Sequence, residues 1–195
     1  MDPETGHAWI AFEDWKDGSI RLMKFDGKSK SKPMKISQGG RNFRPRVIVT
    51  RKSGKHKGAP AVSWDSYRDG QYDAYLSVLS SGRPGPELRA SKSPLWDCDT
   101  DLCEDGDGNI WVAWYRASNE LNEFTKHRVI HARLYDGEGW SWPIQPEGLP
   151  PHDNGRLTGY GQCIHPLLRV DKHNRVHLFY RDHSEFMWGF VRHMV

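Results

Sequence analysis

The chain has 195 residues, and its 28 Lys and Arg nearly balance its 25 Asp and Glu, which leaves a net charge of +3. The mean hydropathy of −0.78 is low, yet nine Trp, seven Tyr and seven Phe can bury far more apolar area than a disordered chain offers. No apolar run approaches the roughly 18 residues of a membrane helix, and the first residues lack the basic and apolar regions of a signal peptide. These properties indicate one globular region of short strands and polar loops.

Four segments along the chain share one aromatic strand pattern. They cover residues 8–18, 60–70, 109–115 and 175–181. When the first two are aligned, Phe12 falls on Trp64 and Asp17-Gly18 falls on Asp69-Gly70, an offset of 52 residues. Self-similarity at such a period is typical of a repeat architecture.

Each aromatic segment has the same kinds of neighbour. A short strand is predicted before it, at 45–50, 100–103 and 166–170. Another strand is predicted after it, at 19–25, 72–79 and 129–135, and an outer strand fits 33–36, 86–90 and 142–145. Asp-Gly and Ser-Gly pairs close the hairpins, because Gly adopts a positive φ readily and Asp tolerates one. One period therefore predicts four short antiparallel strands, and no segment shows a sustained helical period.

Repeats of about 50 residues with four strands each are typical of β-propeller blades. We therefore predict an all-β chain with a single propeller region of about 3.5 four-stranded blades. The predicted blades are 1–40 (partial), 41–92, 93–160 and 161–195 (partial). Because the two terminal pieces do not complete one another as a split blade, we expect a fragment of a larger propeller.

Residues 105–143 contain Asp-Gly-x-Gly-Asn-Ile-Trp-Val-Ala-Trp followed by Tyr-Asp-Gly-x-Gly-Trp-Ser-x-Pro. This pattern resembles the sialidase-like and TolB-like propeller repeats of exported bacterial proteins, and the likeness extends over roughly residues 7–190. The resemblance implies a propeller fold and an exported or periplasmic protein. The sialidase Asp-box, Ser-x-Asp-x-Gly-x-x-Trp, has no intact copy, since Ser66 to Gly70 carries similar residues at another spacing.

Candidate ligand-binding residues lie in the loops that gather on one face of a propeller. The set that follows the aromatic strands is Asp65, Tyr67, Arg68, Arg116, Asn119, Glu120, Arg181 and His183. The set that precedes the innermost strands is Arg41, Arg44, Trp96, Asp97, Asp99, Asp101 and His165. Arginines, acids and aromatic rings at a channel mouth suit a sugar or an anionic ligand, although the same residues also suit ordinary polar loops.

The aromatic residues of the repeat fall at two kinds of position. Trp9, Trp64, Trp111 and Trp114 fall on repeat-equivalent strand positions, and we predict that they belong to the core. Trp15, Tyr67 and Trp96 are predicted loop aromatics and are better candidates for stacking on a sugar.

Asp97, Asp99 and Asp101 alternate, which on an extended strand places three carboxylates on one face. Ca²⁺, an arginine or backbone amides could offset their repulsion, so calcium is the one candidate metal, and no other cofactor is predicted.

Cys98 and Cys103 could form a disulfide in an oxidising compartment, or all three cysteines could stay reduced.

The basic stretches 28–35 and 51–57 contain Gly, Ser or Pro, and we interpret them as solvated loops and not as a nucleic-acid surface.

Without an intact catalytic motif, the first hypothesis is a non-enzymatic recognition or scaffold module for a carbohydrate, an anionic ligand or another protein domain. The alternative is a sialidase-like glycoside hydrolase, in which Glu13, Glu120 or Glu185 pairs with Asp65 or Asp97. A third hypothesis is a Ca²⁺-dependent carbohydrate binder.

Overall fold

The computed structural model describes residues 5–51, 53–117, 128–146, 152–153, 156–157, 163–182 and 190–194. These residues form β-strands and turns, so the predicted all-β class is confirmed. Among them, no helix could cross a membrane.

The strands form four antiparallel sheets in chain order, which we call blades 1 to 4. Blade 1 contains β1 (Ala8–Asp14), β2 (Ser19–Phe25) and β3 (Met34–Lys35). Blade 2 contains β4 (Arg41–Val49), β5 (Pro60–Arg68), β6 (Gln71–Val78) and β7 (Leu88–Arg89). Blade 3 contains β8 (Trp96–Glu104), β9 (Ile110–Ala117) and β10 (Arg128–Tyr135), and blade 4 contains β13 (Cys163–Val170), β14 (Val176–Asp182) and β15 (Phe190–Met194). A short hairpin pairs β11 (His152–Asp153) with β12 (Arg156–Leu157).

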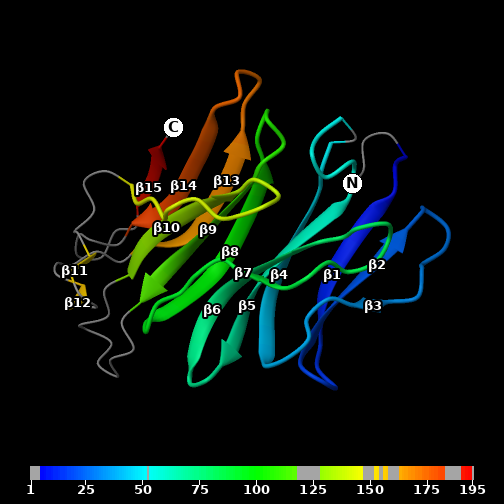
Figure 1. Cartoon of the computed structure of the whole chain (residues 1–195), viewed down its shortest axis with the longest axis horizontal. Helices are drawn as coiled ribbons and strands as arrows, with labels where there is room; N and C mark the ends of the chain where they lie inside the picture. Colours follow the sequence, from blue (N-terminus) through cyan, green and yellow to red (C-terminus); the bar gives the residue numbers. More distant parts are fainter. Residues whose placement is uncertain are drawn as a thin grey trace.

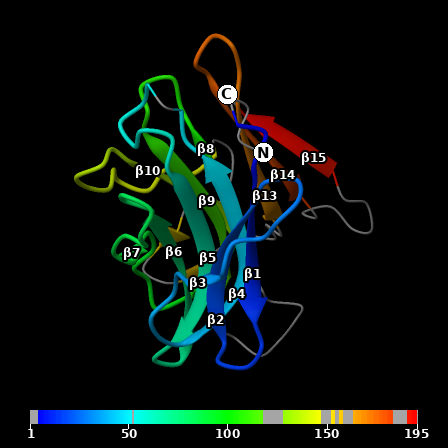
Figure 2. The same ribbon diagram turned by 90° about the vertical axis from the view of Figure 1, so that its right-hand side faces the viewer.

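The four blades are arranged like part of a propeller, with their inner strands side by side (Figure 1). β4 lies between β1 and β8, and β8 contacts β13. A pocket of about 690 Å³ lies between the C-terminal halves of β4, β8 and β13. Figure 2 shows the two ends of the blades: the turns 105–109 and 171–175 lie at one end, and the hairpin turns 15–18 and 69–70 lie at the other. We call the second end the mouth.

Apolar side chains fill each junction between neighbouring blades. Between blades 1 and 2 the core contains Ile20, Leu22, Ile36, Val62, Trp64, Tyr75 and Leu79. Between blades 2 and 3 it contains Ala61, Ala74, Leu76, Ala90, Leu102, Ile110, Val112 and Trp114. Successive residues of β5, such as Ala61 and Val62, therefore point into different junctions, which explains why this strand is apolar on both faces. Each buried residue of this kind stabilises the fold by about 1.5–3 kcal/mol.

The two central tryptophans are held by equivalent hydrogen bonds. Nε1 of Trp64 donates to Asn42 at 3.0 Å, and Nε1 of Trp114 donates to Asp97 at 2.8 Å. Both rings are fully buried, as the repeat alignment predicts for core positions. A buried indole N–H needs an acceptor, and in both blades the second residue of the innermost strand of the same blade supplies it.

The observed strands differ from the predicted ones at two kinds of position. The inner strands begin three or four residues earlier than expected, because each contains a β-bulge that interrupts the alternation seen in the sequence. The outer strand expected at 142–145 is reduced to a bridge between Ala132 and Ile144. The three cysteines are buried, and Cys98 and Cys103 form no disulfide.

Candidate active site at the channel mouth

Three inner strands carry a bulge at the same place. Arg44 in β4, Asp99 in β8 and His165 in β13 have positive φ angles of 51°, 59° and 54°. In each strand the pairing with the neighbouring strand shifts across this residue. A positive φ is unfavourable for residues other than Gly, and such strain tends to gather at functional sites. A bulge also redirects the side chain that it carries.

The redirected side chains enter one hydrogen-bonded network that joins four blades. Nε of Arg44 donates to Oδ2 of Asp65 at 2.6 Å, and the amide of Asp99 donates to the same oxygen at 2.9 Å. Oδ2 of Asp99 lies 2.5 Å from Nδ1 of His165. The amide of Arg44 donates to Oε1 of Glu13 at 2.8 Å. We call Glu13, Arg44, Asp65, Asp99 and His165 the mouth cluster.

The repeat supplies two of the carboxylates in the mouth cluster. Glu13 follows the anchor residue Phe12 in β1, and Asp65 follows Trp64 in β5. Each carboxylate accepts the bulge amide of the next blade, from Arg44 and Asp99 respectively. One repeat position therefore connects the second strand of a blade to the innermost strand of the next.

Asp65 is fully buried and holds the network in place. Burial raises the pKa of Asp65 to about 6, although Arg44 and the amide of Asp99 favour the ionised form. Burial also lowers the pKa of Arg44, but the attraction of Asp65 outweighs this and leaves that pKa raised. The Arg44–Asp65 pair is therefore ionised at neutral pH and loses the negative charge in mild acid.

Within the mouth cluster the side chains of Arg44 and His165 are 43% and 64% exposed and Glu13 is half-buried, whereas the side chains of Asp65 and Asp99 are 0% and 7% exposed. A ligand at the mouth would first meet a guanidinium and an imidazole, with the Asp99 carboxylate directly behind the imidazole. Asp65 is a positioning residue, because its carboxylate is covered by the groups that it binds.

A hollow of about 270 Å³ adjoins Glu13 at the mouth. It is lined by residues 13–18 and 41–43, which include Trp15 and Arg41. Trp15 is 87% exposed and is therefore available for stacking. An exposed ring beside a carboxylate and a guanidinium is a common composition for a sugar subsite.

A second group of aromatic rings lies at the same end, between blades 2 and 3. The ring of Tyr72 is centred 4.9 Å from Tyr67, 5.9 Å from Phe43 and 5.7 Å from Trp96. The predicted platforms Tyr67 and Trp96 are thus brought together by Tyr72, which the sequence analysis did not single out. Its position in the hairpin directly after Asp69-Gly70 is the signal that could have found it.

Arg68 and Arg116 are engaged inside their own blades. Arg68 makes two hydrogen bonds of 2.8 and 2.9 Å to Glu87, and Nε of Arg116 donates to Asp97 at 2.7 Å. Burial raises the pKa of Asp97, which also accepts the indole N–H of Trp114. Arg44, Arg68 and Arg116 thus bind three different carboxylates and form no arginine triad of the kind that sialidases use.

The remaining candidate ligand-binding residues from the sequence analysis do not belong to the mouth cluster. Arg41 lines the hollow beside Glu13, and Arg181 is exposed on β14 at the position equivalent to Asp65. Asn119, Glu120, His183 and Glu185 lie outside the described residues.

Asp97, Asp99 and Asp101 have three different environments. The bulge between Cys98 and Asp101 breaks the alternation that placed the carboxylates on one face, so that expectation is wrong. Asp97 pairs with Arg116, Asp99 contacts His165, and Asp101 accepts the amide of Leu168 at 2.8 Å. Within the part of the chain that the structure describes, no three His, Cys, Asp or Glu side chains gather around a possible metal position. The geometry of these three residues gives the calcium hypothesis no support.

No protein-family model and no curated protein matches this sequence, but its fold matches solved structures. The chain is similar to the GH93 α-L-arabinofuranosidase of Fusarium graminearum, with 12% identity and a TM-score of 0.63, over 99% of this chain and 60% of that one. It is similar to the endo-arabinase of Bacteroides thetaiotaomicron, with 16% identity and a TM-score of 0.57, over 98% and 70%. It is also similar to the α-L-arabinanase of Penicillium chrysogenum, with 11% identity and a TM-score of 0.58, over 100% and 65%. The chain spans 60% of the length of the first of these enzymes.

These similarities confirm a propeller-like repeat fold, and they are not specific to the sialidase-like or TolB-like repeats that the sequence resembles. They also correct the first functional hypothesis. The prediction of a non-enzymatic recognition or scaffold module is contradicted, because the three similar solved structures named above are an α-L-arabinofuranosidase and two arabinanases, which are glycoside hydrolases. The comparisons favour the alternative hypothesis of a glycoside hydrolase.

Proposed function

We propose that this chain is part of a glycoside hydrolase that cleaves arabinose-containing polysaccharides at the channel mouth. The observation that carries the proposal is the mouth cluster, in which strained bulges on three inner strands bring three carboxylates, a guanidinium and an imidazole together. The arabinan-cleaving activities named for the similar solved structures support the substrate class.

Hydrolysis of a glycosidic bond needs one carboxyl to protonate the leaving oxygen and a second to act as base or nucleophile. We assign the first role to Glu13, because it lines the hollow in which Trp15 and Arg41 could hold the sugar. We assign the second role to Asp99, which would take the proton of the attacking water. His165 contacts its Oδ2 and orients the carboxylate. Asp65 positions Arg44 and the backbone of Asp99 and does not touch the substrate.

The test is hydrolysis of linear arabinan and of an aryl α-L-arabinofuranoside by the purified chain, with an aryl β-xyloside as the comparison substrate. Glu13→Gln and Asp99→Asn should each lower kcat by at least about 100-fold, as expected for loss of a general acid or base. The matched control is Glu138→Gln, which makes the same change in an exposed turn and should retain activity. Full activity in Glu13→Gln, or no hydrolysis of either arabinose substrate, would overturn the proposal.

A further inference from the structure

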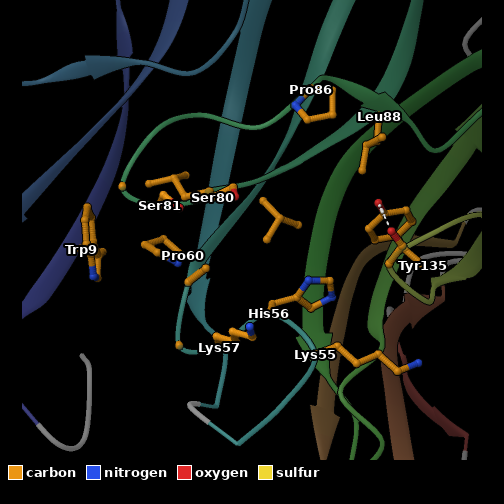
Figure 3. A pocket seen from close by; sticks show the side chains of 16 residues that line it. Trp9, Lys55, His56, Lys57, Pro60, Ser80, Ser81, Pro86, Leu88 and Tyr135 are labelled. Carbon is orange, nitrogen blue, oxygen red and sulfur yellow. Dashed lines mark hydrogen bonds between the residues drawn. The ribbon is translucent and has the colours of Figure 1, made fainter.

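A large cavity lies at the end of the blades opposite the mouth. It has a volume of about 770 Å³ and is lined by residues from blades 1, 2 and 3. Trp9 of β1 stands on one side and Tyr135 of β10 on the other, with Pro60 and His56 between them (Figure 3). We call this cavity the basal pocket.

The charge of the basal pocket is positive. Lys55, His56 and Lys57 line it, and its lining contains no Asp or Glu. Nζ of Lys55 donates to Asn109 at 2.6 Å, whereas the Lys57 side chain has no hydrogen bond or ion pair among the described residues. Nζ of Lys24 adds a further cation 6.0 Å from the centre of the Trp9 ring. Lys55 and Lys57 belong to the basic stretch 51–57, and Lys24 lies four residues before the stretch 28–35.

Asp136 and Glu104, the acidic groups near the pocket, each accept a backbone amide, and Oε1 of Glu104 is buried without a hydrogen-bond partner among the described residues. The carboxylate of Asp136, next to Gly137 in the lining, accepts the amides of Glu138 and Gly139 in its own turn at 2.9 and 2.8 Å. Glu104, which attracts His56, accepts the amide of Arg51 at 2.7 Å. Lys57 therefore has no carboxylate partner in the pocket and keeps its charge available for a ligand.

The pocket also carries groups suited to a sugar ring. His56 stacks on Tyr135 with their planes 14° apart, and Nε2 of His56 is buried without a hydrogen-bond partner in the described structure. Burial lowers the pKa of His56, so the ring is neutral at neutral pH and can exchange a hydrogen bond with a hydroxyl group. The hydroxyl-bearing Ser80 and Ser81 lie on the wall above Pro60 (Figure 3).

We infer that the basal pocket is a second binding site, for a sugar unit that bears a carboxylate, such as the galacturonate units of an acidic polysaccharide. Trp9 and Tyr135 provide aromatic surface for the ring, and Lys57 provides the cation for the carboxylate. This inference goes beyond the proposed hydrolysis and does not depend on it, because the pocket and the mouth cluster lie at opposite ends of the blades.

The experiment is isothermal titration calorimetry of the whole chain with trigalacturonate, with maltotriose as the neutral probe and sodium sulfate as the small anion. Lys57→Gln should weaken trigalacturonate binding by roughly fivefold or more, which is the loss of about one charge-assisted contact. Lys172→Gln, the same change in an exposed turn of blade 4, should alter binding by less than about twofold. Circular dichroism melts would confirm that both variants fold.

Maltotriose should bind at least about fivefold more weakly than trigalacturonate, since it lacks the carboxylate. The inference is overturned by the absence of trigalacturonate binding, by equal binding of maltotriose, by equal binding of sulfate, or by unchanged affinity in Lys57→Gln. Glu13→Gln separates the two proposals: it should abolish hydrolysis and leave trigalacturonate affinity unchanged. If Glu13→Gln still hydrolyses the substrate, only the proposed hydrolysis fails. If trigalacturonate does not bind, only the proposed second binding site fails.

Discussion

Nδ1 of His165 lies 2.5 Å from Oδ2 of Asp99, and this contact joins the inner strands of blades 3 and 4. The two residues are 66 positions apart in sequence and occupy the same bulge position in their strands. An exposed imidazole thus orients a nearly buried carboxylate. The same relationship between a reactive group and its orienting partner recurs in many hydrolytic sites.

We predict that His165 and Asp99 act as a unit. His165→Ala should lower kcat on arabinan by about 10- to 100-fold, because Asp99 loses the group that orients it. The free energy of unfolding should change by less than about 1 kcal/mol, since the imidazole is largely exposed. In the double variant with Asp99→Asn, kcat should fall no further than in Asp99→Asn alone, as steady-state kinetics would show. If the fold-reductions in kcat of the two single variants multiplied in the double variant, the two residues would act independently.

Asp65 should make the stability of the chain depend on pH in mild acid. Its pKa is raised from 3.8 to about 6 by burial, so between these values the folded chain binds more protons than the unfolded chain. The contribution of Asp65 to the free energy of unfolding is therefore largest below pH 4 and declines as the pH rises to about 6. Urea unfolding from pH 4 to pH 7 should show this decline in the original chain and a smaller one in Asp65→Asn. Identical slopes in the two proteins would contradict the raised pKa.

Asp97 should be essential for the stability of blade 3. Its buried carboxylate binds Arg116 and accepts the indole N–H of Trp114, so Asp97→Ala leaves both donors without a partner. We expect a loss of about 3–5 kcal/mol in the free energy of unfolding, measured by urea denaturation. Asp107→Ala, in an exposed turn of the same blade, should cost less than about 1 kcal/mol. A similar cost for both substitutions would show that the buried network contributes little.

The three cysteines should be unreactive in the folded chain. All three are buried thiols outside any disulfide, and burial raises the pKa of Cys98 and of Cys103 to about 12. Because the thiolate is the reactive form, iodoacetamide at pH 8 should label none of them within the time that labels all three in urea. Mass spectrometry of the intact chain would count the labels. Rapid labelling of the folded protein at Cys98 or Cys103 would refute the buried arrangement.

The architecture is determined by local patterns that a reader of the sequence can follow. The anchors Phe12, Trp64 and Trp114 recur at a nearly constant spacing, and Gly at the hairpin turns adopts the positive φ that such turns need. Both signals extend over a few residues, so they can be recognised in the sequence without knowing which distant residues are in contact. The same signals do not reveal chemistry, which is why the first functional hypothesis was a non-enzymatic module and was wrong.

The site depends on contacts that only the tertiary structure decides. Asp97 and Asp99 look alike in the sequence, yet a bulge between them sends one into the core beside Arg116 and the other toward His165. A bulge changes the direction of a side chain without leaving a clear mark in the pattern of apolar residues. Sequence alone thus determined the repeated strands, the turns and the buried tryptophans. Packing of blade against blade decided which polar residues meet at the mouth, because those partners lie 21 to 66 residues apart and have no local signal.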